Sequence, residues 1–143
     1  MKDTFIPSKK QAKQQWFLID AQDKCLGRLS TEIAKILKGK NKNFYLPYQN
    51  IGDYVIIINA DKILISGKKA IQKVYFRHSG RPGGKTIETF ENLQNRLPER
   101  IIEKAVKGML PKNRLGRKLF TKLKVYKNQE HPHHSQKPKI IEL

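Results

Sequence analysis

The chain has 143 residues, 38% of them apolar, and carries 30 Lys and Arg residues against 12 Asp and Glu, a net charge of +18. This length suits one compact domain and leaves little room for a second. A free domain with such a charge repels itself, whereas bound phosphates neutralise it, so the composition predicts a nucleic-acid-binding protein. Basic residues occur in every third of the sequence, unlike a neutral body with one basic tail.

The cysteine content and the length of the apolar segments indicate the kind of compartment in which the protein works. Cys25 is the single cysteine, so no disulfide forms within the chain, and a reducing compartment is expected. A lone cysteine is most often a small buried residue. The longest apolar run, 55–58, is far too short to span a membrane. Residues 1–15 contain no apolar stretch suited to the core of a signal peptide.

The first elements in chain order are a strand, a helix and a second strand. Residues 16–19 form an apolar run closed by Asp20, as in a strand. Apolar residues recur at helical spacing over 27–37, and Gly39 stops this helix. Tyr54–Ile58 is apolar at every position, which is typical of a central parallel strand covered on both faces.

The second half of the chain alternates between strands and helices. Short strands are expected at 63–65 and 73–77, and residues 80–84 form a flexible glycine-rich loop. Three helices are then expected: one over 87–95 with Ile87, Phe90 and Leu93 inward, one that begins at Pro98 and ends by Pro111 with Met109 on its apolar face, and one over 112–124.

This order of elements predicts an α/β layer architecture with a small, mostly parallel sheet. No internal repeat or linker divides the chain, so residues 1–143 are expected to form a single domain. Residues 1–15 are expected to be an N-terminal extension. Residues 128–143 are rich in Pro and His and are expected to be an extended C-terminal tail.

The strongest functional signal is the segment from Lys104 to Lys127, which contains nine Lys and Arg residues and no Asp or Glu. On a helical wheel for 112–124, one arc is apolar and the other is basic. A solvated helix face normally mixes charges of both signs. The sequence contains no zinc finger, no leucine zipper and no paired aromatics of an RNA-recognition motif. The segment therefore favours recognition of the shape and phosphates of a folded RNA.

Residues 79–86, Ser-Gly-Arg-Pro-Gly-Gly-Lys-Thr, resemble the phosphate-binding P-loop G-x-x-x-x-G-K-[ST]. The last three positions match, but the first is Ser79, and Pro82 removes one of the backbone N–H donors that such a loop uses. A small NTPase is therefore the alternative from the enzyme class. The favoured interpretation is a glycine-rich loop whose backbone, Arg81 and Lys85 approach an RNA phosphate.

Three histidines, His131, His133 and His134, cluster near the C-terminus. A metal site would need further ligands on rigid elements, and Glu130 is the nearest acidic residue. The favoured interpretation is that these histidines face solvent or RNA, so no metal site is expected. His78 is expected to contact phosphate or to pack at the neighbouring loop.

Residues 106–126, VKGMLPKNRLGRKLFTKLKVY, closely resemble a stretch of the L13 family of large-subunit ribosomal proteins. Similar motifs occur in the same order from about residue 16 to residue 138, and residues 1–15 match least. These motifs are WFLID with LGRL, GDY through NADK, 73–78 with the following glycines, PER at 98–100, and EHPH at 130–133.

The resemblance implies a three-layer α/β/α domain with a short, mostly parallel sheet that binds large-subunit rRNA. Members of the family are structural, have no catalytic role and take part early in assembly of the large subunit. The implied partners are rRNA and neighbouring large-subunit proteins, and no cofactor, membrane contact or homo-oligomer is expected. The family supports the region of RNA contact, while charge and placement select the residues: Arg77, His78, Arg81, Lys85, Lys107, Lys112, Arg114, Arg117, Lys118, Lys122 and Lys124.

Two matters stay open at the level of sequence. The ribosome concerned is expected in a bacterial cytoplasm or a plastid stroma. The excess of Lys over Arg, 23 to 7, slightly favours an AT-rich genome such as that of a plastid. A regulatory alternative, in which the free protein binds an mRNA, is neither supported nor excluded by the sequence.

Overall fold

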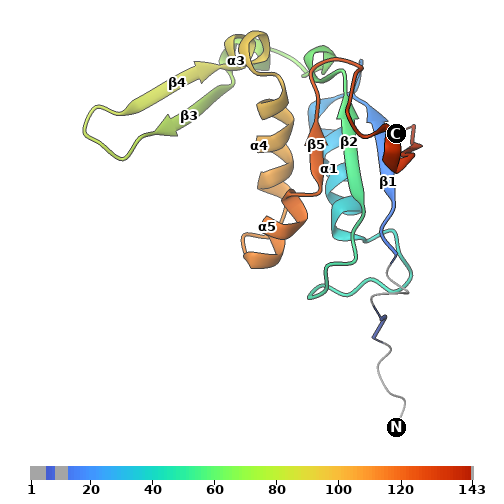
Figure 1. The fold of residues 1–143 in the computed structure, drawn as a ribbon. Coiled ribbons are helices and arrows are strands. Elements are labelled where there is room, and N and C mark those ends of the chain that lie inside the picture. The colour runs from blue at the N-terminus through green and yellow to red at the C-terminus, as the bar shows by residue number, and fades with distance from the viewer. Residues whose placement is uncertain (1–5, 9–12, 143) are drawn as a thin grey trace.

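The computed structural model describes residues 6–8 and 13–142, so most of the expected N-terminal extension, 1–15, lies outside the described residues. Figure 1 shows the chain. In order, its elements are β1 (Trp16–Asp20), α1 (Leu26–Lys38), β2 (Tyr54–Ile58), η1 (Ala60–Lys62), α2 (Lys69–Gln72), β3 (Val74–His78), β4 (Lys85–Thr89), α3 (Phe90–Arg96), α4 (Glu99–Met109), α5 (Arg114–Phe120), β5 (Leu123–Val125), η2 (His134–Gln136) and β6 (Lys139–Ile140).

Four parallel strands in the order β5-β2-β1-β6 form the main sheet. β2 lies inside this sheet, where Tyr54 pairs with Trp16 of β1 and Val55 pairs with Leu123 of β5. Four of the five β2 residues are buried, because layers cover both faces of the strand. The expected central strand and the α/β class with a short, mostly parallel sheet are therefore confirmed.

One face of the sheet is covered by α1 and α4, which also pack against each other. The apolar residues of α1 at helical spacing are all buried, as expected: Leu29, Ile33, Ile36 and Leu37. They share a core with Val55 and Ile57 of β2 and with Ile101, Ile102 and Val106 of α4. No helix in the described part of the chain combines the length and apolar character needed to cross a bilayer.

The opposite face of the sheet is covered by the C-terminal segment. Trp16 and Tyr54 point to this side, where their rings stack with centroids 4.3 Å apart. The His133 ring lies 5.3 Å from that of Trp16, and a hydrogen bond of 2.8 Å joins His133 Nε2 and the Tyr126 hydroxyl. Beyond η2, β6 pairs with β1. Residues 128–143, expected to be an extended tail, therefore return to the sheet over their described part.

The region 63–95 differs from the expectation. Residues 63–65 contribute one isolated bridge, Cys25 to Leu64, and no strand. β3 forms as expected, but β4 is antiparallel to it and occupies residues that were expected to begin a helix. Ile87 pairs with Phe76 and is exposed instead of inward. The helix α3 begins only at Phe90, because the Thr89 hydroxyl accepts a hydrogen bond from Asn92 N and caps it.

The helix expected over 112–124 is shorter in the structure. α5 ends at Phe120, and β5 begins at Leu123 and pairs in parallel with β2. The wheel therefore holds for Leu115, Leu119 and Phe120, whereas Leu123 reaches the same core from a strand. α4 agrees with its expected extent, although Met109 is exposed at its last position instead of lying on the apolar face.

The end of α1 is held against the segment that leads into β2 by a contact between two glycines. Gly39 ends the helix with φ at +78°, where its N–H donates to Ile36 O. A Cβ added to Gly52 would lie 1.7 Å from Leu37 O, inside any permitted contact. The backbone itself therefore fills this position, and Gly52 has no room for a side chain.

We predict that Gly52→Ala destabilises the fold by about 3 kcal/mol, because α1 and the start of β2 must separate to admit the methyl group. Urea denaturation followed by circular dichroism measures the change. Gly27→Ala is the matched control, since Gly27 lies in α1 with nothing within 4 Å of its added Cβ. That variant should gain up to about 1 kcal/mol from helix propensity. Equal stabilities for the two variants would contradict the close packing at Gly52.

Candidate nucleic-acid interface

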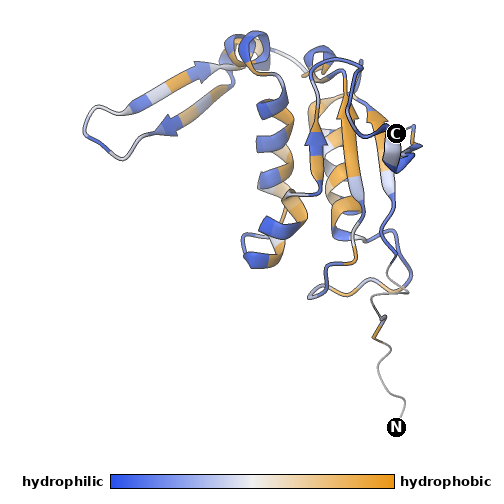
Figure 2. Ribbon diagram, in the orientation of Figure 1, coloured by the Kyte–Doolittle hydropathy of each residue, from blue (hydrophilic) through white to orange (hydrophobic). Residues whose placement is uncertain are grey.

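α4 presents its cations to solvent because its apolar residues are fixed on the core. Ile101, Ile102 and Val106 are buried against α1 and the sheet. Lys104 and Lys107, one helical turn apart, therefore project from the other side of the helix. Figure 2 shows this division between the hydrophobic strands and the hydrophilic outward side of α4 and α5.

The turn between α4 and α5 is fixed by hydrogen bonds to backbone groups that the helix ends leave free. Lys38 of α1 donates from Nζ to Met109 O at 2.9 Å, at the carbonyl end of α4. Asn113 caps α5, since its Oδ1 accepts from Gly116 N at 2.8 Å. Gly116 packs on Pro111, where an added Cβ would lie 1.7 Å from the Pro111 carbonyl oxygen. These contacts fix the backbone of the turn, from which its cationic side chains project.

A cavity of about 450 Å³ opens at this turn and brings three of the predicted site residues together: Lys107, Lys112 and Arg117. Its remaining lining is Leu110, Pro111, Asn113, Gly116 and Phe120. Lys107 Nζ lies 5.9 Å from the centroid of the Phe120 ring. The cavity thus combines an apolar floor with a rim of three cations.

Lys104, Lys107, Lys112, Arg114, Arg117 and Lys118 are all exposed, and we call them the α4–α5 basic surface. Within residues 6–8 and 13–142, no ion pair involves any of these six side chains. Cations elsewhere do find acidic partners, as Arg96 does with Glu88 and Lys35 with Glu32. The α4–α5 basic surface therefore carries positive charge that the described chain leaves unneutralised.

Lys122 does not belong to this surface, which corrects its assignment as an RNA contact. Its residue is 3% exposed, and its Nζ donates to Gly52 O at 2.6 Å. Burial lowers the pKa of Lys122 from its ordinary value to about 8. The negative charge of Asp53 raises this pKa and so opposes the shift, whereas the positive charge of Lys42 lowers it further. The assignment failed because Lys122 precedes strand β5 and is not on a helix face.

Lys124 is also placed differently from the expectation. It lies on β5 opposite Ile56, on the face of the sheet covered by the C-terminal segment, and it is half-buried. It therefore stands apart from the α4–α5 basic surface.

The remaining predicted residues lie on the β3–β4 hairpin, which projects from the body of the molecule in Figure 1. Arg77, His78, Arg81 and Lys85 are all exposed there, and we call them the hairpin tip. Gly80 N donates to His78 Nδ1 at 2.9 Å, so His78 packs at the loop as expected. This bond leaves Nε2 as the ring nitrogen that can meet a ligand.

The hairpin rules out the P-loop alternative. A P-loop lies between a strand and a helix, so that its Lys and Thr open the helix. Here Lys85 and Thr86 belong to β4, and the loop closes on itself through Ser79 N to Gly84 O at 3.0 Å and Gly84 N to Arg81 O at 2.9 Å. The backbone N–H groups of Ser79 and Gly84 are thus occupied within the loop, and no helix N-terminus faces it.

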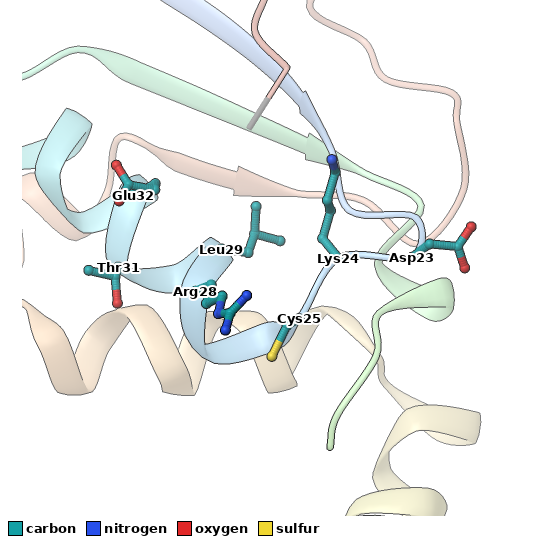
Figure 3. Close-up of a pocket in the computed structure, with 7 residues that line it drawn as sticks. All are labelled: Asp23, Lys24, Cys25, Arg28, Leu29, Thr31 and Glu32. Atoms are coloured by element: carbon teal, nitrogen blue, oxygen red, sulfur yellow. The ribbon is translucent and has the colours of Figure 1, made fainter. Parts of the chain in front are cut away.

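The C-terminal histidines and the single cysteine lie outside the two basic clusters. The rings of His131 and His134 stack at 4.4 Å, yet no group of three or more His, Cys, Asp or Glu in the described residues is arranged to hold a metal ion. Cys25 is exposed, contrary to the expectation that it is buried. It lines a cavity of about 600 Å³ at the start of α1 with Asp23, Lys24, Arg28, Leu29, Thr31 and Glu32 (Figure 3). That cavity mixes charges of both signs, unlike the α4–α5 basic surface.

The hairpin tip lies at the far end of the projecting β3–β4 hairpin, whereas the α4–α5 basic surface lies along α4 and α5 on the body of the molecule (Figure 1). Sequence reasoning identified both clusters and began the basic segment at Lys104, but it did not assign Lys104 as an RNA contact. In the structure Lys104 Nζ lies 4.8 Å from the centroid of the Tyr75 ring. The spacing of Lys104 and Lys107, three residues apart on one helix, was the signal that could have placed Lys104 on the same surface.

Comparison with known proteins gives one consistent result. The family model described as Ribosomal protein L13 matches residues 14–132. Curated proteins named large ribosomal subunit protein uL13 match the whole chain and 95% of their own length: one from Crocosphaera subtropica is 63% identical, one from Gloeothece citriformis is 60% identical, and one from Synechococcus elongatus is 59% identical.

The lowered pKa of Lys122 predicts how stability changes with pH. The folded-state pKa of about 8 lies below the ordinary 10.5, so between these values the unfolded chain binds more protons than the folded one. Stability therefore rises with pH across this window. From pH about 7.5 to about 10, Lys122 should contribute a gain of about 2 kcal/mol that Lys122→Met lacks.

Urea denaturation at the two pH values measures this difference. Lys118→Met, which removes an exposed cation of α5, is the matched control and should keep the pH response of the original chain. The same pH response in Lys122→Met would show that the Lys122 amine is not desolvated in the fold.

Proposed function

Because the chain belongs to the ribosomal protein L13 family, we propose that it is a structural constituent of the large ribosomal subunit that binds rRNA. Its role is that of a scaffold component and not of an enzyme. Its relatives are named large ribosomal subunit proteins, and the similarity to them extends over the whole chain. The ribosome concerned is that of a bacterial cytoplasm or a plastid, in keeping with the cyanobacterial origin of these relatives.

The single observation that carries the proposal is the α4–α5 basic surface. Six exposed cations stand on α4, on α5 and in the turn between them, without an acidic partner in the described chain. Holding like charges together in this way costs free energy, and phosphates relieve that cost. The hydrogen-bonded turn at Pro111 and Asn113 fixes the backbone from which these side chains project, so little backbone entropy is lost when RNA binds.

Binding works through the release of counterions. Each phosphate that a Lys or Arg neutralises frees condensed cations from the RNA, so the affinity falls steeply as salt rises. Arg114 and Arg117 can each bind a phosphate through two parallel hydrogen bonds, whereas Lys107 and Lys112 act as mobile point charges. None of these contacts reads a base, so recognition depends on where the fold of the RNA places its phosphates.

Two separated clusters suit a protein that joins RNA segments. The hairpin tip lies at the far end of the projecting β3–β4 hairpin, while the α4–α5 basic surface lies on the body of the molecule (Figure 1). RNA strands that repel each other can approach when each meets a cation cluster on one rigid body. This arrangement supports a role early in subunit assembly, when distant rRNA segments first come together. Neighbouring ribosomal proteins are further partners, because proteins that bind the same rRNA segments lie next to one another in the subunit.

We predict that neutralising two cations of the cavity rim, with Lys112→Gln and Arg117→Gln combined, weakens rRNA binding and reduces its salt dependence. The slope of log affinity against log salt should fall by about 1.4–1.8, from about 0.7–0.9 for each lost phosphate contact. Filter binding of the full chain to purified large-subunit rRNA over a salt series measures the slope.

Lys35→Gln is the matched control, because Lys35 is exposed but already forms an ion pair with Glu32. Its slope should equal that of the original chain. If the double variant also keeps the original slope, the α4–α5 basic surface is not the rRNA contact. If the original chain fails to co-sediment with large subunits after a high-salt wash, the structural role itself is lost.

A further inference from the structure

One face of the β3–β4 hairpin is left uncovered by the described chain. Side chains alternate along both strands, and Phe76 pairs with Ile87 while His78 pairs with Lys85, which brings these four to the same side. Phe76 is 59% exposed, Val74 56% and Ile87 54%, a high exposure for three apolar residues in one strip. We call this surface the Phe76 face; it comprises Val74, Phe76, His78, Lys85 and Ile87.

The other face of the hairpin explains the direction in which the Phe76 face points. Tyr75 is half-buried and lies against the core, with Lys104 Nζ of α4 at 4.8 Å from its ring. Glu88 forms an ion pair with Arg96 of α3 at 2.6 Å. Both contacts tie the Tyr75 side of the ribbon to the body, so the Phe76 face is turned away from it.

The surroundings of the Phe76 face show which kind of partner suits it. Residues 62–87 contain seven Lys and Arg and no Asp or Glu. Lys85 Nζ lies 5.7 Å from the centroid of the Phe76 ring, and the His78 ring lies 6.3 Å from it. Lysine is depleted at protein–protein interfaces and abundant where phosphates bind. An exposed aromatic ring within a purely cationic segment therefore fits a nucleic acid better than a protein.

We propose that the Phe76 face binds an unpaired RNA base, which stacks on the Phe76 ring while Lys85 and Arg81 meet the neighbouring phosphates. The proposal rests on the proposed function, since the RNA is rRNA, and it adds a base contact to a surface otherwise read through phosphates. Bases turned out of loops and bulges stack on exposed aromatic side chains in this way. Val74 and Ile87, beside the ring, shield the stacked base from water.

The test uses the full chain with purified large-subunit rRNA of Synechococcus elongatus, source of a relative 59% identical. Short-wave ultraviolet light joins stacked bases to aromatic rings, and mass spectrometry of the digested complex should find a nucleotide on Phe76. Phe76→Leu, which keeps an apolar side chain but no ring, should weaken binding about 5- to 100-fold, the range for one lost stack. Phe76→Trp should bind at least as tightly as the original chain.

Two controls distinguish base stacking on Phe76 from the broader proposal that the protein binds rRNA through its charges. Ile140→Ala removes an exposed apolar side chain from β6 and should leave the affinity unchanged. Phe76→Leu should keep the salt slope, because it removes no charge. Circular dichroism checks that each variant retains its fold, as the exposure of Phe76 leads us to expect.

Each failure has a distinct meaning. If the original chain binds rRNA with a steep salt slope but Phe76→Leu binds equally well, base stacking is overturned and the proposed function stands. If Phe76→Leu keeps its rRNA affinity yet no longer joins large subunits, the Phe76 face contacts a protein, which also overturns stacking. If the original chain does not bind rRNA, the proposed function fails and this inference fails with it.

Discussion

The fold depends on the close approach of two backbone segments at Gly52, where no side chain fits against the Leu37 carbonyl. That approach brings the Gly52 carbonyl under Lys122, whose amine donates to it at 2.6 Å. The next residue, Asp53, accepts from Lys42 Nζ at 2.6 Å and from Gln15 N at 2.9 Å. Helix α1, the entry to β2, the approach to β1 and the start of β5 therefore meet at one point. This meeting point sets the relative positions of the layers that carry the basic surfaces.

Position in the fold, and not residue type, decides what a lysine does in this protein. Lys42 and Lys122 lie within the fold and satisfy a carboxylate and carbonyl oxygens. Lys38 reaches across to the end of α4 and holds its last carbonyl. The lysines of the α4–α5 basic surface have no such partner in the described chain and keep their charge available to phosphates. Net charge alone would count all of them as RNA-binding groups, although some are structural.

The sequence predicts the elements that local patterns specify. It fails where the structure of a segment depends on pairing with a strand elsewhere in the chain. Tyr54–Ile58 and the apolar spacing of α1 are read correctly, because uniform burial and a helical period leave a clear pattern. Residues 87–89 were expected to start a helix, yet Ile87 and Thr89 pair with β3, a partner that no local period reveals. Lys122 was assigned to RNA for the same reason, since only the start of β5 places it inside. The sequence locates both exposed basic clusters, but it does not reveal that the ring of Phe76 is exposed between the strands of a hairpin and the solvent.

The strand order β5-β2-β1-β6 has a consequence for the rate at which the native state forms. β6 follows its partner β1 by more than a hundred residues in the sequence. Between β2 and its partner β5, the chain forms the β3–β4 hairpin and the helices α3, α4 and α5. Such contacts join distant parts of the chain, so each must close a long loop before it stabilises anything, and folding is correspondingly slow. Until β6 arrives, the outer edge of β1 is open to pairing with another chain. In the finished sheet β6 pairs with β1 at Phe17 and Leu18, so the last strand of the chain also protects this edge.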